Sequence, residues 1–310
     1  MGEVFPVIRK TLGHYGKHIL MSPAIYREEI MLSMGPSAKW IMMVLLLISV
    51  ACAAMSLAKD KELMPEELIA EHIKSIGSPT VLEGMRTRVI MGTSTVQLVQ
   101  GAFGQPSGQA QIASDGRKLG ILMRYDDLAY PGEHFAFDGK DVTISRLLPK
   151  GKISPLAEFI HRFDGVMKEG LLGGALSIAW PLRNIQETRP RLNYNKAKLA
   201  GHPIHALEYR PRKGLGDLKI VLFFELETFH HIRTEYRLHI PGVDQYDLLS
   251  EDFADFKEVD GMMLPQRYTI SFSSFSSYGG RSTFLAHWIF DAKQWIHNGQ
   301  IDSLIFRASE

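Results

Sequence analysis

A hairpin over residues 218–238 carries the clearest alternation of apolar and polar positions in the chain. In its second half, Arg233, Glu235 and Arg237 alternate with less polar neighbours, which predicts a strand with one solvated and one buried face. The buried face of this half consists of four residues: Ile232, Thr234, Tyr236 and Leu238. One side of the returning strand should therefore pack against another layer of the protein.

The first half of the same hairpin is apolar on both faces. Val221 and Phe223 lie on one side, which we expect the N-terminal helix or a neighbouring segment to cover. The other side continues into the buried face of the returning strand and consists of Ile220, Leu222, Phe224 and Leu226. The hairpin therefore predicts a large apolar surface that needs a covering layer.

Similar stretches with turn residues between them recur along most of the chain. Asp138-Gly139 in "HFAFDGKDVTISRL" is the strongest short-range hairpin signal, and Asp115-Gly116 separates two further strands. The remaining predicted strands are residues 85–100, 192–199, 203–210, 253–258, 264–275 and 282–291. About ten strands with hairpin-length links predict an α+β, mainly antiparallel β fold built as one meander.

Two stretches have helical periodicity instead. In residues 64–77, Pro65 suits a first turn and Gly77 can end the helix. Its apolar stripe consists of Leu68, Ile69, His72, Ile73 and Ile76. In residues 154–177, Ser154 can cap a second helix, with Pro155 in its first turn.

The second helical stretch interrupts the run of strands and is itself interrupted. Phe159 and Phe163 belong to its apolar stripe, but Gly170, Gly173 and Gly174 follow. We therefore expect residues 154–177 to form a helix that ends in a bend or mobile loop.

The N-terminal residues predict export. Residues 40–58 contain no charge, have an apolar centre at Ile41–Ile48 and end in small residues. This arrangement is typical of a secretory signal peptide cleaved between Ala54 and Lys59, which implies a periplasmic protein. A segment of this length can also just span a bilayer, so an uncleaved inner-membrane anchor is the alternative.

This segment divides the rest of the chain into an N-terminal extension and a C-terminal domain. Residues 1–39 are too long for the basic region of a signal, so they are either a mis-assigned start or a short cytoplasmic tail. Residues 59–310 are expected to form a single domain, since no linker divides them. Cys52, the only cysteine, lies in the predicted signal, so the mature chain has no internal disulfide.

Composition excludes one class of partner. Of the 310 residues, 45% are hydrophobic and the net charge is +1, so no basic field indicates nucleic-acid binding. We expect a monomer without a cofactor.

Several motifs in order carry a resemblance. "FDGKDVTI", "KLAGHPIHALEYRPRKGLGDLKIVLFFELETFHHIRTEYRL", "ADFKEVDGMMLPQRYTI" and "NGQIDSLIF" follow an amphipathic helix and frame a helical insertion. This order, over most of residues 60–308, resembles the LolA/LolB-type periplasmic lipoprotein carriers. The Arg-Pro pair usual before the "DGK" hairpin of that family is not apparent here, where "DGRKLGI" occupies the region.

The resemblance implies a half-barrel, a strongly curved sheet whose concave face is lidded by helices. It also implies lipid or lipoprotein acyl chains as ligands and an envelope membrane protein as a partner. The missing Arg-Pro pair leaves lipid binding as the broader expectation.

On this basis we expect an apolar cavity between sheet and lid. Its predicted lining comprises Ile220, Leu222, Phe224, Leu226, Ile232, Tyr236, Leu238, Phe159 and Phe163. An apolar face suits an acyl chain, because each buried methylene contributes about 0.8 kcal/mol without a specific partner. The same residues could instead form a filled core, as in an envelope scaffold or interaction protein.

An enzyme is the competing class. His202, His205, His230 and His231 lie near two strand ends, but a spacing of three places the first pair on opposite faces of a strand. The chain has no metalloprotease helix motif, no G-x-S-x-G and no cysteine after the predicted signal. The sequence therefore predicts a non-enzymatic protein with no catalytic residues and no metal site.

Overall fold

The computed structural model describes residues 63–101, 104–239, 246–275 and 282–308. The predicted N-terminal extension and the predicted signal or anchor lie outside these residues. Within the described part of the chain, no helix is long and apolar enough to cross a membrane.

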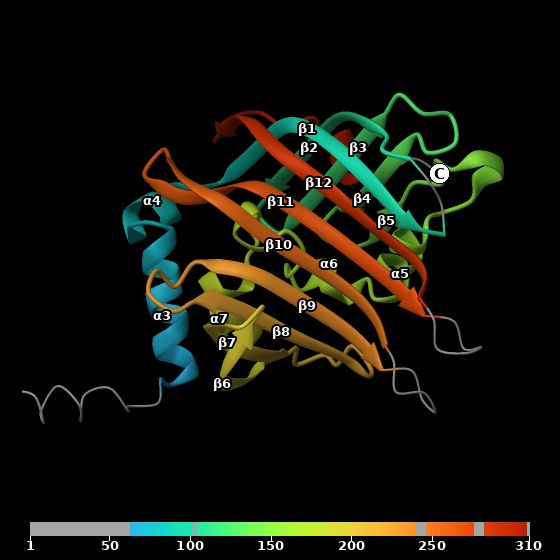
Figure 1. Cartoon of the computed structure of the whole chain (residues 1–310). Helices are drawn as coiled ribbons and strands as arrows, with labels where there is room; N and C mark the ends of the chain where they lie inside the picture. Colours follow the sequence, from blue (N-terminus) through green and yellow to red (C-terminus); the bar gives the residue numbers. More distant parts are fainter. Residues whose placement is uncertain (1–62, 102–103, 240–245, 276–281, 309–310) are drawn as a thin grey trace, which may run out of the picture. The chain divides into compact units, whose positions relative to one another are not determined.

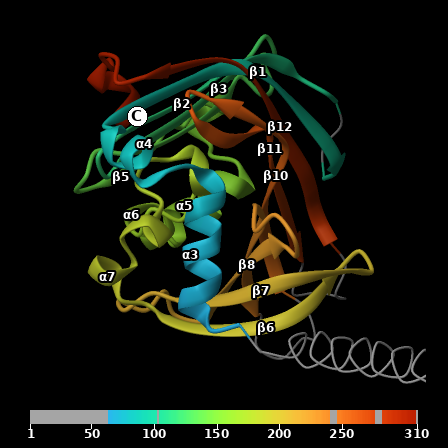
Figure 2. The same ribbon diagram turned by 90° about the vertical axis from the view of Figure 1, so that its left-hand side faces the viewer.

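Twelve strands of the described residues form one antiparallel sheet that curves strongly around the helical segments (Figures 1 and 2). The first five strands are β1 (Thr87–Gln100), β2 (Ser107–Asp115), β3 (Lys118–Tyr125), β4 (Gly132–Phe137) and β5 (Val142–Ile144). The others are β6 (Arg191–Leu199), β7 (His202–Arg210), β8 (Leu218–Glu225), β9 (His231–His239), β10 (Tyr246–Val259), β11 (Met262–Phe275) and β12 (Ser282–His297). The predicted antiparallel α+β half-barrel is confirmed.

The strand order differs from the single meander that the sequence predicted. The order in the sheet is β5-β4-β3-β2-β1-β12-β11-β10-β9-β8-β7-β6, so two meanders are joined where β1 pairs with β12. Alternation within a strand does not reveal which distant strand it pairs with, and the prediction therefore missed this junction. As a result, the chain leaves the sheet at edge strand β5 and returns at the opposite edge strand β6.

The residues between these two edges form an inserted segment, residues 145–190, on the concave side of the sheet (Figure 2). Its elements are η2 (Pro149–Gly151), α5 (Pro155–Arg162), α6 (Gly165–Lys168), η3 (Gly174–Leu176), η4 (Pro181–Asn184) and α7 (Ile185–Thr188). Ser154 caps α5 as predicted, because its Oγ accepts a hydrogen bond from the Ala157 N–H at 3.0 Å.

Left-handed glycines follow α6 and precede η3 in the inserted segment. Gly170 and Gly173 have φ angles of 81° and 80°, in the left-handed region that glycine adopts without a steric penalty. The predicted interruption after α5 is therefore confirmed, and the segment is a series of short helices and turns.

Helix α3 (Pro65–Ile76) confirms the predicted N-terminal helix and is followed by α4 (Pro79–Gly84). The His72 ring of α3 lies 4.9 Å from the Phe224 ring, so α3 belongs to the concave side of β8. One of our two expectations, that this helix covers Val221 and Phe223, is therefore wrong. These two side chains pack on the outer face with Ile204 and Ala206 of the neighbouring strand β7.

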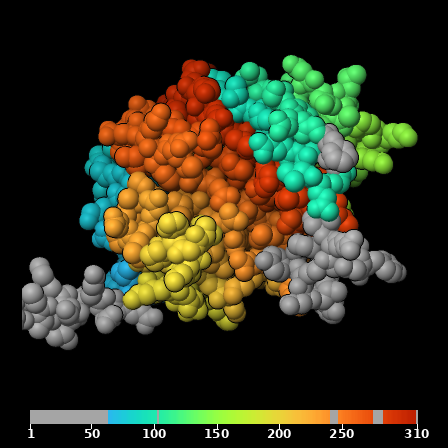
Figure 3. Space-filling view, in the orientation of Figure 1, coloured from blue at the N-terminus to red at the C-terminus, as the bar shows by residue number. Residues whose placement is uncertain are grey.

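The outer face of the sheet, seen in Figure 3, also carries the C-terminal turn η5 (Ser303–Phe306). Ile305 and Phe306 pack against Val89 and Ala113. The turn approaches the sheet closely at Gly120, where an added Cβ would lie 2.3 Å from the Ile305 carbonyl oxygen.

We expect Gly120→Ala to lower the free energy of unfolding by about 1–3 kcal/mol, because its methyl group would displace the C-terminal turn. Gly84→Ala, at the end of α4, is the matched control, since an added Cβ there meets no atom within 4 Å. Urea unfolding measures both variants. Equal stability of the two would show that the turn does not pack on Gly120.

Candidate functional site: the concave face and its inserted segment

Most of the side chains predicted to line a cavity lie together in the core on the concave side. The residues that do so are Ile220, Leu222, Phe224, Tyr236, Leu238, Phe159 and Phe163. Tyr236 lies opposite Ile220 in the β8–β9 register, and Leu238 lies opposite Leu218. The inserted segment and the hairpin therefore share one apolar cluster.

Two predicted lining residues lie elsewhere. A register shift between Phe223 and Phe224 places His231 opposite Phe224, so Ile232 joins the outer cluster around Phe223. Such a bulge adds one residue to a strand and reverses the alternation beyond it, which a strict period of two does not anticipate. Leu226 follows the end of β8, lies in the turn and is 44% exposed.

The apolar cluster on the concave face is filled by protein side chains. Between α5 and strands β9 and β11, Phe159, Phe163 and Leu238 line an open cavity of about 160 Å³. A second cavity of about 10 Å³, lined by residues such as Met123 and Trp288, lies beneath β2 and β3. Drug-sized ligands occupy cavities of about 300–1,000 Å³. Neither cavity reaches this size, so the inserted segment fills the apolar cluster in this structure.

Arg88 is one of three buried charged groups that hold the inserted segment to the sheet. It is 2% exposed and donates to the carbonyl oxygens of Ala175 and Leu176 at 2.7 and 3.0 Å. Burial, with a further contribution from Arg183, lowers the pKa of Arg88 to about 9. A cation so enclosed depends on these carbonyl groups to replace its water.

Glu251 is the second such group. Its carboxylate is fully buried and accepts hydrogen bonds from the Gly173 N–H at 2.6 Å and the Tyr236 hydroxyl at 2.7 Å. The Tyr268 hydroxyl donates to it at 2.5 Å. Burial raises the pKa of Glu251 to about 7, although these hydrogen bonds favour the charged form.

Glu133 is the third. It accepts a hydrogen bond from the Tyr130 hydroxyl and also hydrogen-bonds to Ser154, the cap of α5. Trp288 in turn donates to the Tyr130 hydroxyl at 2.7 Å. Burial raises the pKa of Glu133 to about 7. The start of α5 is therefore attached to the sheet through a buried carboxyl group.

A cluster of aromatic and histidine rings joins α3, the inserted segment and β9. Trp180 Nε1 donates to His72 Nε2 at 3.0 Å, and the His231 ring stacks on Trp180 with centroids 4.9 Å apart. Because His72 Nε2 accepts, its Nδ1 carries the proton and donates to the Phe229 carbonyl oxygen at 3.0 Å. Burial lowers the pKa of His72 to about 4, so the ring is neutral.

The four histidines noted in the sequence lie in separate environments. His205 hydrogen-bonds to Tyr194 and His230 stacks on Phe256, whereas His231 lies in the buried ring cluster. His202 is exposed at the start of β7. Among the residues that the structure describes, no group of three or more His, Cys, Asp or Glu could hold a metal ion.

Sequence reasoning missed Arg88, Glu133 and Glu251, although a signal was present. Arg88 lies two positions from Ile90, Glu133 lies two from Phe135, and Glu251 lies two from both Leu249 and Phe253. Each of these core residues is on the same face of the strand as the charged residue. A lone charge at such a position is a buried polar group in need of partners. Here the partners belong to the inserted segment.

We expect the stability of the protein to depend on pH through Glu251. Its pKa in the folded state lies above the ordinary 4.5, so the folded state binds more protons between about pH 4.5 and 7. The free energy of unfolding should therefore fall as pH rises through this range. Glu251→Gln keeps an acceptor but cannot ionise, and should remove a pH-dependent contribution of about 3 kcal/mol at most.

Urea unfolding of both proteins at several pH values measures the effect. The difference between them isolates Glu251, since Glu133 and the buried histidines contribute to both. A difference that stays constant from pH 4.5 to 8 would show that Glu251 does not titrate in this range.

Searches of protein-family models and of curated proteins each returned no match. Among solved structures, LolA superfamily protein NE2245 from Nitrosomonas europaea matches at 12% identity and a TM-score of 0.42, covering 79% of this chain and 98% of that chain. MucB in complex with MucA(peri) matches at 8% identity and a TM-score of 0.19, covering 73% of this chain and 94% of that chain.

At these identities a likeness concerns the fold alone. Both TM-scores lie below 0.5, so neither match bears on what this chain does.

Proposed function

We propose that this protein is a periplasmic carrier or binding protein for a lipid or lipoprotein acyl chain. The chain would be held between the concave face of the sheet and the inserted segment. The observation that carries the proposal is that a large apolar face is covered by a separate stretch of chain, held by a small number of buried polar contacts. No catalytic step is part of this proposal.

The apolar face supplies the binding energy in this account. Ile220, Leu222 and Phe224 of β8 and Tyr236 of β9 are fully buried beneath the covering elements. An acyl chain that replaced those elements would bury the same surface, at about 0.8 kcal/mol for each methylene. It would need no specific polar partner along its length.

The inserted segment has features of a movable cover. Its backbone passes through left-handed glycines at Gly170 and Gly173, and its polar attachments include those to Arg88, Glu133 and Glu251. Polar attachments suit opening, because water replaces the lost hydrogen bonds and the net change for each is about 0.5–3 kcal/mol. Short elements joined by such hinges can open while the sheet remains paired.

We propose that this structure is a closed form whose entrance is the cavity beside α5. The cavity of about 160 Å³ opens between α5 and the sheet, and its lining includes Phe159, Phe163, Leu238 and Phe272. The Phe159 ring packs 5.4 Å from the Phe272 ring. Movement of α5 would extend this cavity into the apolar cluster.

An envelope scaffold with a filled core is the second candidate, because the concave face is filled in this structure. In that case the inserted segment is a permanent layer, and its polar contacts serve only to fix it. The two candidates differ in whether this segment opens and whether an acyl chain can take its place.

We expect Arg88→Met to open the cover and strengthen binding of a fluorescent fatty acyl probe. The substitution removes the donor to Ala175 and Leu176, so the closed form loses a charge-assisted contact and the competent form is more populated. If the substitution destabilises only the closed form, by about 1.4 kcal/mol, the apparent affinity for the probe rises roughly tenfold. Hydrogen exchange of residues 168–176 should accelerate relative to residues 218–238.

Arg124→Met is the matched control, since Arg124 is an exposed residue of β3. It should leave both probe binding and exchange unchanged. If wild-type protein binds no probe, and residues 168–176 are as strongly protected as residues 218–238 in both variants, the scaffold is the correct candidate.

A further inference from the structure

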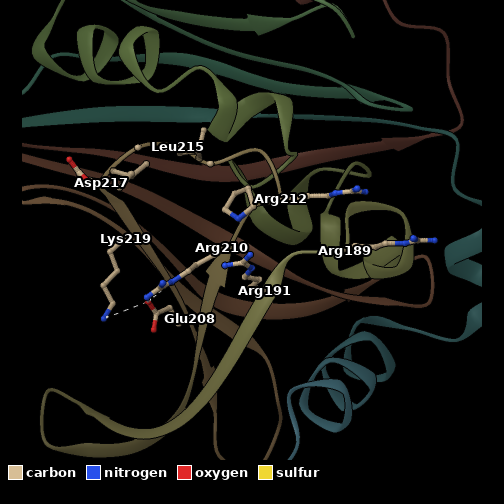
Figure 4. A pocket seen from close by; sticks show the side chains of 12 residues that line it. Arg189, Arg191, Glu208, Arg210, Arg212, Leu215, Asp217 and Lys219 are labelled. Atoms are coloured by element: carbon tan, nitrogen blue, oxygen red, sulfur yellow. Dashed lines mark hydrogen bonds and ion pairs between the residues drawn. The ribbon is translucent and has the colours of Figure 1, made fainter.

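A cavity of about 760 Å³ lies at the rim of the sheet, where the loop of residues 211–217 connects β7 to β8 (Figure 4). Arg191 of β6 and Arg210 of β7 project from neighbouring strands, and Arg189 and Arg212 line the pocket from the adjoining loops, with side chains that extend away from the Arg210 guanidinium (Figure 4). An adjacent cavity of about 280 Å³ is lined in part by Arg191, Glu208 and Arg210. None of these residues belongs to the apolar site between sheet and inserted segment.

Positive charge is in excess in this rim pocket. Its basic residues are Arg189, Arg191, Arg210, Arg212 and Lys219, and its acidic residues are Glu208 and Asp217. Glu208 accepts from Arg210 at 2.7 Å and lies 3.9 Å from Lys219, so one carboxylate serves two cations. Among the residues that the structure describes, Arg189, Arg191 and Arg212 form no ion pair with Glu208 or Asp217.

Two features of the backbone hold these cations together against their repulsion. Arg191 and Arg210 are direct partners in the β6–β7 register, and like charges directly opposite each other destabilise a strand pair. Arg189, just before β6, has a φ of 46°, a left-handed conformation that is uncommon for a side chain of this kind. A bound anion would relieve this repulsion.

The rim pocket also adjoins the inserted segment. Leu215, in its lining, packs on the core and touches α6, where an added Cβ on Gly165 would lie 2.2 Å from Leu215 Cδ2. Leu218 is buried at the start of β8. The pocket thus has a basic side that faces solvent and an apolar side that continues into the core.

We propose that the rim pocket binds a phosphate group, the head group of an amphiphile whose acyl chain occupies the site beneath the inserted segment. Guanidinium groups match the oxygens of phosphate in pairs, and several arginines together suit a group with more than one negative charge. The lipid source of the phosphate rests on the function proposed above. The phosphate chemistry of the pocket does not, because a free phosphate compound would use the same arginines.

The test compares three probes on the full mature chain at low, constant ionic strength, where such contacts are strongest. The probes are 1-acylglycerol 3-phosphate, the uncharged 1-acylglycerol with the same chain, and glycerol 3-phosphate. Wild-type protein should bind the phosphate-bearing amphiphile about tenfold more tightly than the uncharged one. In the double variant Arg191→Gln/Arg210→Gln this preference should disappear, while binding of the uncharged amphiphile stays the same.

Lys196→Gln/Lys198→Gln removes two exposed charges from the same strand outside the pocket and is the control. It should retain the preference for phosphate. Urea unfolding without ligand checks that the arginine variant is folded, and the removal of two opposed cations should not destabilise it.

The remaining outcomes separate the two proposals. If glycerol 3-phosphate binds wild type but not the arginine variant, and neither amphiphile binds, the phosphate pocket stands with a free compound as its ligand and the acyl carrier fails. If both amphiphiles bind wild type equally and glycerol 3-phosphate does not bind, the phosphate pocket is refuted while the acyl carrier stands. Equal losses in the arginine variant and the lysine control would also refute it.

Discussion

The pairing of β1 with β12 is the constraint on which the rest of the structure depends. It joins two meanders into one sheet and places β5 and β6 at opposite edges. The chain between these edges has to cross the sheet, and because the sheet is curved, the concave side is where it does so (Figure 2). Without this pairing, the inserted segment would have no reason to lie over the apolar face.

Crossing the concave face gives the inserted segment two kinds of contact with different consequences. Its apolar residues, Phe159 among them, keep water from the sheet, and this contribution grows with the area buried. Its backbone is fixed at a few positions by hydrogen bonds to Arg88 and Glu251. The burial of these two charged groups costs free energy unless they are hydrogen-bonded. These charged contacts therefore contribute more to the position of the segment than to the stability of the fold.

The parts of the fold that depend on local sequence were predictable. Asp115-Gly116 and Asp138-Gly139 do mark hairpin turns, and Ser154 does cap α5, because each of these signals acts over a few residues. The concave side was also predictable for Leu222 and Phe224. The predicted placement of Leu226 and Ile232 on the concave face was wrong for local reasons. Strand β8 ends one residue before Leu226, and a bulge moves Ile232 to the outer face; neither feature changes the apolar pattern.

What the sequence did not reveal is set by contacts between distant residues. The partners of Arg88 and Glu251 in the inserted segment lie 78 or more positions away along the chain. The rim pocket likewise forms only when Arg191 and Arg210 become partners in neighbouring strands. In both cases the pairing that gives each residue a role depends on the topology.

The central claim is that the apolar concave face exchanges the inserted segment for an acyl chain. Native mass spectrometry of the mature protein, purified from cells without detergent extraction, tests it most directly. The account predicts a population of protein carrying the added mass of one lipid or acyl chain, which is lost when competing fatty acid is added. A protein that carries no such mass, and acquires none when incubated with acyl lipids, would contradict the claim.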